Sequence, residues 1–130
     1  MKKPLKNLPD TNIIVRYLIK DNIDLYNQAE NFFKKVKTGK EKAIILESVI
    51  VECVYVLTKT YKVPKDKAVD SLIDILCYRG IVNDDQKELI EALSIFGKHN
   101  TDIVDCIIYV KAKHINATLF SFDKRLNKGF

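Results

Sequence analysis

The spacing of apolar residues predicts α-helices along most of the chain. Residues 25–36 and 85–98 carry apolar side chains at intervals of three and four, which places them on one face of a helix. Residues 49–61 are apolar on nearly every side, as in a helix buried in a core. Asp10 and Asp102 each precede an apolar run and are suited to cap a helix N-terminus. The predicted helices span residues 11–19, 25–36, 49–61, 64–78, 85–98 and 103–114.

Short runs of β-branched and apolar residues between these helices predict strands. Residues 43–46, 80–83 and 117–121 are of this kind, and a short segment before Asp10 would supply a first strand. Strands that alternate with helices indicate an α/β fold with a mostly parallel sheet. Ligands bind at the carboxyl ends of the strands in such sheets, so polar residues at these ends are candidate site residues.

The composition fits a single domain over residues 1–130. Hydrophobic residues make up 47% of the chain, and only 4 Gly and 3 Pro leave little room for linkers. The 22 Lys and Arg outnumber the 17 Asp and Glu, and the net charge of +5 favours an anionic partner. No apolar run is long enough to span a membrane. Three separated cysteines in apolar segments predict buried free thiols and a cytoplasmic location: Cys53, Cys77 and Cys106.

Four acidic residues lie against apolar sequence or at the end of a predicted strand: Asp10, Glu52, Asp105 and Asp123. A buried carboxylate is costly unless a base or a cation neutralises it, and none of the four has a basic neighbour in its apolar stretch. We therefore expect them to converge on a divalent cation. Oxygen ligands without nearby His or Cys favour Mg²⁺ or Mn²⁺ over zinc. Such an ion beside a basic surface suits hydrolysis of a phosphodiester.

Each acid also has a simpler structural interpretation. Asp10 and Asp102 could do no more than cap helices, with Asp105 as the reciprocal partner of Asp102. Asp123 could only begin a turn. Glu52 would be an ordinary exposed residue if its helix had an exposed face. The occurrence of all four together favours the cation site over these separate interpretations.

The order of these motifs resembles the PIN-domain ribonucleases, and most closely the VapC toxins of VapBC toxin–antitoxin pairs. The matching segments are Asp-Thr-Asn-Ile-Ile at 10–14, the apolar run around Glu52 at 49–57, Asp-Ile-Val-Asp-Cys-Ile-Ile at 102–108 and Phe-Ser-Phe-Asp-Lys at 120–124. The resemblance covers roughly residues 8–126. It implies a three-layer α/β/α sandwich with a short, mostly parallel central sheet, and a Mg²⁺- or Mn²⁺-dependent endoribonuclease.

The resemblance also implies roles for individual residues. The acidic site of the family corresponds here to Asp10, Glu52, Asp105 and Asp123, with Asp102 as a second-sphere or water-mediated ligand. Asn12 corresponds to the polar residue that orients the first acid, and Ser121 to the hydroxyl residue two positions before the last. Members of the family commonly form homodimers, are silenced by a cognate antitoxin protein and cut structured RNA, often transfer RNA.

Basic residues near such a groove would hold the RNA backbone through its phosphates. We expect Arg16, Lys124 and Arg125 to serve this role. Asn12 argues against a phosphatase that forms an aspartyl-phosphate, because that chemistry needs a second Asp at this position. The remaining alternative is a catalytically weak PIN-like module that binds RNA or assembles with other proteins.

Overall fold

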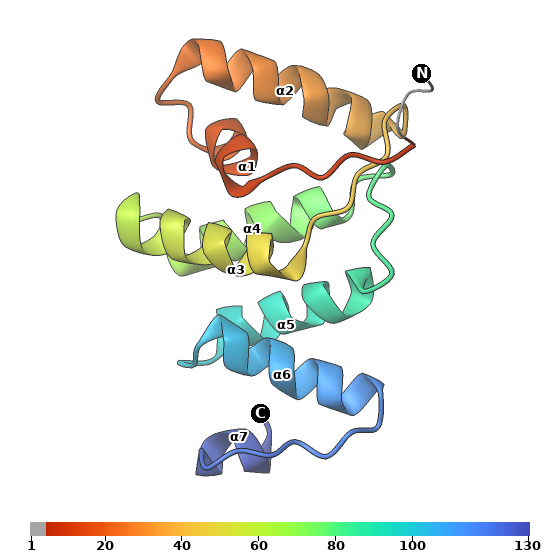
Figure 1. Cartoon of the computed structure of the whole chain (residues 1–130). Helices are drawn as coiled ribbons and strands as arrows, with labels where there is room; N and C mark the ends of the chain where they lie inside the picture. Colours follow the sequence, from red (N-terminus) through yellow and green to blue (C-terminus); the bar gives the residue numbers. More distant parts are fainter. Residues whose placement is uncertain (1–4) are drawn as a thin grey trace. The chain divides into compact units, whose positions relative to one another are not determined.

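The structure, a computed structural model, describes residues 5–130 as helices joined by loops and extended segments (Figure 1). The chain divides into two compact units, the first ending at Asp84 and the second running from Asp85 to Phe130. The first unit contains α1 (Thr11–Leu18), α2 (Ile23–Thr38), α3 (Glu47–Tyr55), the π-helix η1 (Val56–Thr60) and α4 (Lys65–Leu76). The second unit contains α5 (Gln86–Lys98), α6 (Ile103–His114) and α7 (Lys124–Lys128).

All six predicted helices are present, and local hydrogen bonds set their ends. Asn22 caps α2 by accepting from the Leu25 N–H at 3.1 Å, and Gly39, with φ of 85°, ends that helix. The predicted helix 49–61 changes from α to π at its end. There the Thr58 hydroxyl donates to the Val54 carbonyl at 2.7 Å, an acceptor that the α-helical ladder would otherwise use.

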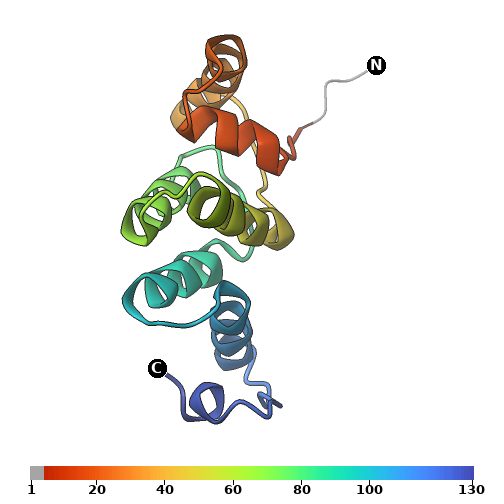
Figure 2. The ribbon, with the colours of Figure 1, turned by 90° about the vertical axis from the view of Figure 1, so that its left-hand side faces the viewer.

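Helices α1, α2, α3 and α4 enclose the core of the first unit. In Figure 1 α1 is seen nearly along its axis while α2 lies across the view, and Figure 2 reverses this, so the two helices cross steeply. Phe33 of α2 is fully buried at the crossing, with its ring centroid 4.6 Å from that of Tyr17. Helix α3 packs against both α1 and α4. The largest fully buried side chains of this core are Phe33, Ile14, Ile45, Ile50, Leu57, Leu72, Ile75 and Leu76.

Three extended segments of the first unit meet at isolated parallel bridges. Asn7 pairs with Ala43, and Ala43 pairs with Ile81. The Asn7 N–H donates to the Lys42 carbonyl at 2.9 Å, and the Val82 N–H donates to the Ala43 carbonyl at 2.9 Å. In Figure 1 the three segments come together near the end of α2 and then diverge. Each bridge joins one residue pair, so no strand forms among the described residues.

The prediction of an α/β/α sandwich with a central parallel sheet is therefore wrong for the described chain, and two residues explain why the bridges do not extend. The next donor along the first segment would be the N–H of Pro9, which proline lacks. On the other side, the Asn83 side chain accepts from the Ile45 N–H at 2.9 Å and donates to the Ile45 carbonyl at 2.7 Å. These are the groups through which the ladder would have continued. Residues 117–121, the last of the predicted strands, form no strand either.

Helices α5 and α6 pack along one another to form the core of the second unit. Of the apolar residues expected to face inward on α5, Leu89, Leu93 and Phe96 are buried and Ile90 is only half-buried. Leu126 of α7 is buried as well. The buried side chains of this unit are Leu89, Ala92, Leu93, Phe96, Ile103, Cys106, Ile107, Val110 and Leu126.

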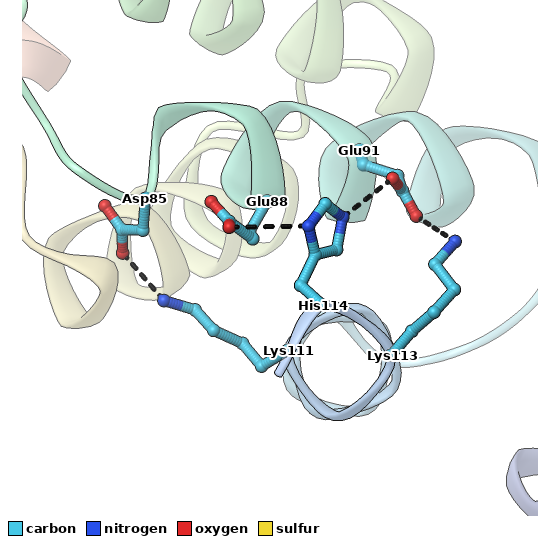
Figure 3. Close-up of polar contacts among 6 residues, drawn as sticks. All are labelled: Asp85, Glu88, Glu91, Lys111, Lys113 and His114. Carbon is cyan, nitrogen blue, oxygen red and sulfur yellow. Dashed lines mark hydrogen bonds and ion pairs between the residues drawn. The ribbon is translucent and has the colours of Figure 1, made fainter. Parts of the chain in front are cut away.

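A row of polar contacts joins α5 to α6 beside this core (Figure 3). The Lys111 ammonium lies 2.9 Å from an Asp85 carboxylate oxygen. His114 lies between Glu88 and Glu91, with Nδ1 3.5 Å from the first carboxylate and Nε2 3.3 Å from the second. The polar row fixes the register in which the two helices lie, because each side chain has its partner on the other helix.

Two further sequence predictions concern cysteines and membranes. All three cysteines are free thiols, and Cys53 and Cys106 are buried as expected, but Cys77 is exposed. The prediction of a third buried thiol is therefore wrong, because Cys77 follows the last turn of α4 on its outer side. Within residues 5–130, no helix combines the length and the apolar character needed to cross a bilayer.

Candidate functional site

Two of the four predicted acids, Asp10 and Glu52, lie in the first unit near the buried thiol of Cys53. Burial, and then the charge of the Glu52 carboxylate, raise the pKa of the Cys53 thiol to about 12. The Asp10 carboxylate acts in the same direction, and a hydrogen bond with the Thr11 side chain acts against them. Asp10 caps α1 and Glu52 lies on α3, and these two helices pack against each other. Both carboxylates thus lie within electrostatic range of one thiol, although they come from distant parts of the sequence.

Asp10 caps α1. Its Oδ1 accepts from the Ile13 N–H at 3.0 Å. This confirms the structural interpretation of Asp10, but it leaves the second carboxylate oxygen, which accepts no hydrogen bond from the described residues. Because a cap uses one oxygen and a cation ligand can use the other, both roles are compatible.

The other two of the four acids, Asp105 and Asp123, lie in the second unit together with Asp102, the expected water-mediated ligand. Asp102 and Asp123 cap helices there. Asp102 Oδ1 accepts from the Val104 N–H at 2.8 Å at the start of α6. Asp105 lies one turn further along α6 and is half-buried. Asp123 Oδ1 accepts from the Arg125 N–H at 2.9 Å and from the Leu126 N–H at 3.3 Å. Asp123 thereby caps helix α7, so the simpler structural interpretation of this residue is a helix cap rather than a turn.

Ser121 positions Asp123. Its hydroxyl accepts from the Asp123 N–H at 3.0 Å, and its carbonyl accepts from the Asn127 side-chain amide at 2.8 Å. These bonds fix the backbone on both sides of the last acid. Asn12 lies exposed in the first turn of α1.

The premise that these acids are buried does not hold. No charged or polar residue is buried among the described residues. Glu52 is exposed, so α3 has an outward face even though its sequence is apolar on nearly every side. Solvated carboxylates need no cation to offset a cost of burial. Burial of the acids therefore gives no support for a metal site, which would depend on how close the carboxylates lie to one another.

The structure also places the predicted RNA-binding bases. Arg16 Nη1 donates to Asp21 Oδ1 at 2.9 Å, so its guanidinium already has an anionic partner. Arg125 Nη2 donates to the Asn100 carbonyl at 3.0 Å, and Lys124 is exposed. Of the three, the two on α7 remain accessible to a phosphate.

A divalent cation fits the donor chemistry of these acids. Mg²⁺ is usually held by one or two protein carboxylates, with water and substrate phosphate as its other ligands. Asp10 and Glu52 supply carboxylates of this kind from two helices that pack against each other. Taken separately, residues 5–84 and residues 85–130 contain no group of three or more His, Cys, Asp or Glu side chains arranged to hold a metal.

Sequence reasoning missed helix α7 and the residues that follow it. The signals were present, because Asp123 is a good N-cap and Gly129, with φ of 81°, follows the last helical residue. Five helical residues are too few for a hydrophobic period, so the sequence pattern predicts only a turn there. Helix α7 and the residues after it form one side of a cavity, and the loop between α5 and α6 forms the other side.

Comparison with known proteins bears on these residues. The PIN domain family matches residues 8–129, which include all the predicted acids. A VapC ribonuclease of Aquifex aeolicus (strain VF5) is 28% identical over 123 residues, which cover 93% of this chain and 90% of that protein. No solved structure matches the chain. The resemblance read from the four motifs is confirmed, and the chain belongs to the PIN domain family.

Proposed function

We propose that this protein is a metal-dependent endoribonuclease and the toxin of a toxin–antitoxin pair. The observation that carries the proposal is the packing of α1 against α3, because Asp10 caps the first of these helices and Glu52 lies on the second. They are the first two acids of the motif order that resembles the PIN-domain nucleases. The relative from Aquifex aeolicus is named a VapC ribonuclease, which supports RNA as the substrate.

Asp10, Glu52, Asp105 and Asp123 would hold Mg²⁺ or Mn²⁺, with Asp102 acting through water. When bound, such an ion polarises a phosphate oxygen and lowers the pKa of a bound water. The caps of α1 and α7 hold the Asp10 and Asp123 carboxylates in one orientation, each through its Oδ1. Ser121 and Asn12 would support the last and the first acid. The oxygen left over on each capped carboxylate is the donor available to a cation.

The bases hold the substrate in this proposal. Lys124 and Arg125 follow Asp123 directly, so the phosphates they bind would lie beside that acid. Arg16 would have to exchange Asp21 for a phosphate to contribute. We infer that Arg16 has the smaller role of the three.

We extend the proposal to the partners that the family resemblance implies. The protein would act in the cytoplasm as one PIN-like domain over residues 1–130, form a homodimer, and be silenced by a cognate antitoxin. Structured RNA, such as transfer RNA, would be its target. The family match over residues 8–129 supports the single domain.

The test is cleavage of total RNA by the purified protein, with RNA ends mapped in Mg²⁺ and in a chelator. Asp10→Asn, Glu52→Gln, Asp105→Asn and Asp123→Asn each remove a charge while keeping an oxygen, and Asn caps a helix as well as Asp. Each should reduce cleavage by at least about tenfold, the scale of losing support for a bound metal. Asp70→Asn, on the exposed side of α4, is the matched control. Undiminished cleavage by the four variants would overturn the assigned roles.

A second candidate is the weak PIN-like module that binds RNA without efficient cleavage. The observation in its favour is that Asp10, Asp102 and Asp123 each cap a helix and so have a complete structural role. Titration with Mn²⁺ separates the two functions, because a module needs no affinity for the ion. RNA binding without ends generated in Mg²⁺ or Mn²⁺ would favour the module.

A further inference from the structure

A cavity of about 340 Å³ lies in the second unit, between the loop that joins α5 to α6 and the end of α7. Cavities of this size accept small organic ligands or one unit of a polymer. His99 and Thr101 line it from the loop, and Arg125, Lys128 and Phe130 line it from the other side. No acidic side chain is among the described residues that line it. The lining therefore combines positive charge with aromatic rings.

The two sides of this cavity are joined by a hydrogen bond. Arg125 Nη2 donates to the Asn100 carbonyl at 3.0 Å, which holds α7 against the loop. That bond uses one of the five N–H groups of the guanidinium and leaves the others for an anion. The Lys128 ammonium makes no hydrogen bond or ion pair with any described residue. Two positive charges thus border the cavity, and one of them is already oriented.

The aromatic wall of the cavity is preformed. The Phe130 ring lies 5.3 Å from the His99 ring and 5.1 Å from the Tyr109 ring, measured between centroids. Its side chain is still 40% exposed, which leaves ring surface for a ligand. Gly129 allows this packing, since its φ of 81° disfavours other residues and an added Cβ would lie 3.0 Å from Cε1 of Tyr109.

We propose that this cavity binds one nucleotide of an RNA strand, with the base stacked on Phe130 and the phosphate held by Arg125 and Lys128. A free phosphate would have no use for the aromatic wall, and an apolar ligand would leave two cations desolvated without a partner. Proteins hold single-stranded RNA through this combination of aromatic stacking and positive charge. Thr101 is followed directly by Asp102, so the bound nucleotide lies beside an acid of the proposed site.

The inference rests on the proposed ribonuclease function, because RNA is the ligand, but binding can be tested apart from cleavage. We would titrate a labelled RNA hexanucleotide with the full chain in EDTA and follow its fluorescence anisotropy. Phe130→Leu keeps an apolar side chain without the ring and should weaken binding by about tenfold, within the range measured for base stacking on aromatic residues. Phe130→Tyr keeps the ring and should bind within about twofold of the wild type on the same grounds.

The charge arm of the test uses Lys128→Gln, which should weaken binding and lower the slope of log affinity against log salt by about 0.7, as expected for one lost phosphate contact on a single strand. The matched controls are Phe122→Leu, an exposed aromatic outside the cavity, and Lys67→Gln on α4, and both should bind as the wild type does. Circular dichroism confirms the fold of each variant. Binding unchanged in Phe130→Leu, or weakened equally in Phe122→Leu, overturns the nucleotide site. The acid variants test the proposed function separately. If they lose cleavage but bind the hexanucleotide as the wild type does, the nucleotide site and the ribonuclease function both stand, and if they keep cleavage, only the assigned roles of the acids are overturned.

Discussion

The hydroxyls of Tyr17 and Tyr78 lie 2.7 Å apart, although 61 residues separate them in the sequence. Tyr17 belongs to α1, and Tyr78 follows the end of α4. Both rings contact Phe33 of α2, at centroid distances of 4.6 and 6.5 Å. One hydrogen bond and one buried ring thus connect three helices of the first unit.

This pair predicts a loss of stability at high pH. Burial, and then the hydrogen bond with Tyr17, raise the pKa of Tyr78 above its ordinary value of 10.0. The folded state therefore holds this proton more tightly than the unfolded state, so the contribution of Tyr78 to stability is complete below pH 10 and declines above it. A spectrophotometric titration should show tyrosine ionisation extending well above pH 10, and the absence of Trp keeps the phenolate signal clean. The hydrogen bond with Glu30 also raises the pKa of Tyr26, so the part due to Tyr78 is the part that changes in a Tyr17 variant.

The Tyr17→Phe variant tests the cause of this shift. It removes one partner of a part-buried hydrogen bond and should lower the free energy of unfolding by about 1 kcal/mol. The late ionisation should also move toward the ordinary value, because the bond with Tyr17 no longer raises the pKa of Tyr78. Tyr61→Phe is the control, since that side chain lies outside this pair. A single common ionisation step for all six tyrosines of the wild type would contradict the prediction.

The caps predict that charge and stability can be separated at the candidate acids. Asp10→Ala removes the acceptor for the Ile13 N–H and should cost about 1 kcal/mol of stability. Asp10→Asn keeps an acceptor oxygen and should cost little. Asp123→Ala and Asp123→Asn should differ in the same way, through the Arg125 and Leu126 N–H groups.

Urea unfolding of these four variants measures the difference. Glu52→Ala is the control, because Glu52 is exposed and caps no helix, so its replacement should leave stability nearly unchanged. If the Asn variants unfold as readily as the Ala variants, the carboxylate charge rather than the cap stabilises the helix ends.

The sequence predicts the helices because most have a long apolar period, and three of the six begin at a polar residue whose side chain caps them. Asn22, Asp10 and Asp102 cap helices in the structure, as their residue types indicate. The acids of the candidate site could be selected from the sequence because their order carries a family pattern. Their burial could not, since an apolar neighbourhood such as that of Glu52 does not say which side of a helix meets solvent.

The absence of a sheet from residues 5–130 could not be predicted, because pairing depends on groups in other segments. Residues 43–46 have the composition of a strand, yet only Ala43 forms bridges. Pro9 offers no donor on one side, and the Asn83 side chain occupies both Ile45 backbone groups on the other. Each effect depends on a partner more than 30 positions away, where composition within a short window carries no information.

Gly80 should tolerate no side chain, because it is where these extended segments approach one another. Its N–H donates to the Val36 carbonyl at 2.8 Å, and its carbonyl accepts from the Ala43 N–H at 2.8 Å. A Cβ added at Gly80 would lie 2.2 Å from the Glu41 carbonyl oxygen, which is backbone and cannot rotate away. Gly80→Ala should lower the free energy of unfolding by about 2 kcal/mol.

Thermal unfolding of Gly80→Ala measures this loss. Gly97→Ala is the opposite control, because Gly97 is exposed within α5, where Ala should raise stability by about 0.5–1 kcal/mol. Equal stability of Gly80→Ala and the wild type would show that the segments lie further apart than the bridges require.

The polar row between α5 and α6 predicts a ranking of its ion pairs. The Asp85 and Lys111 side chains are 29% and 33% exposed, whereas Lys113 is 53% exposed beside Glu91. Water screens the second pair more strongly. Lys111→Met should therefore destabilise the protein by about 1 kcal/mol, and Lys113→Met by less.

The acid side of the row supplies a pH test. A hydrogen bond from Lys113, supported by His114, lowers the pKa of Glu91 below 4.5. The folded state thus favours the charged form, so the contribution of Glu91 to stability is present above pH 4.5 and is lost as the pH falls below it. Glu91→Gln should be less stable than the wild type at pH 7, and the two should converge at acidic pH. Unfolding curves across this range decide it, with Glu30→Gln, outside the second unit, as the control. A difference that persists unchanged in acid would mean that Glu91 stabilises the helix pair by packing rather than by its charge.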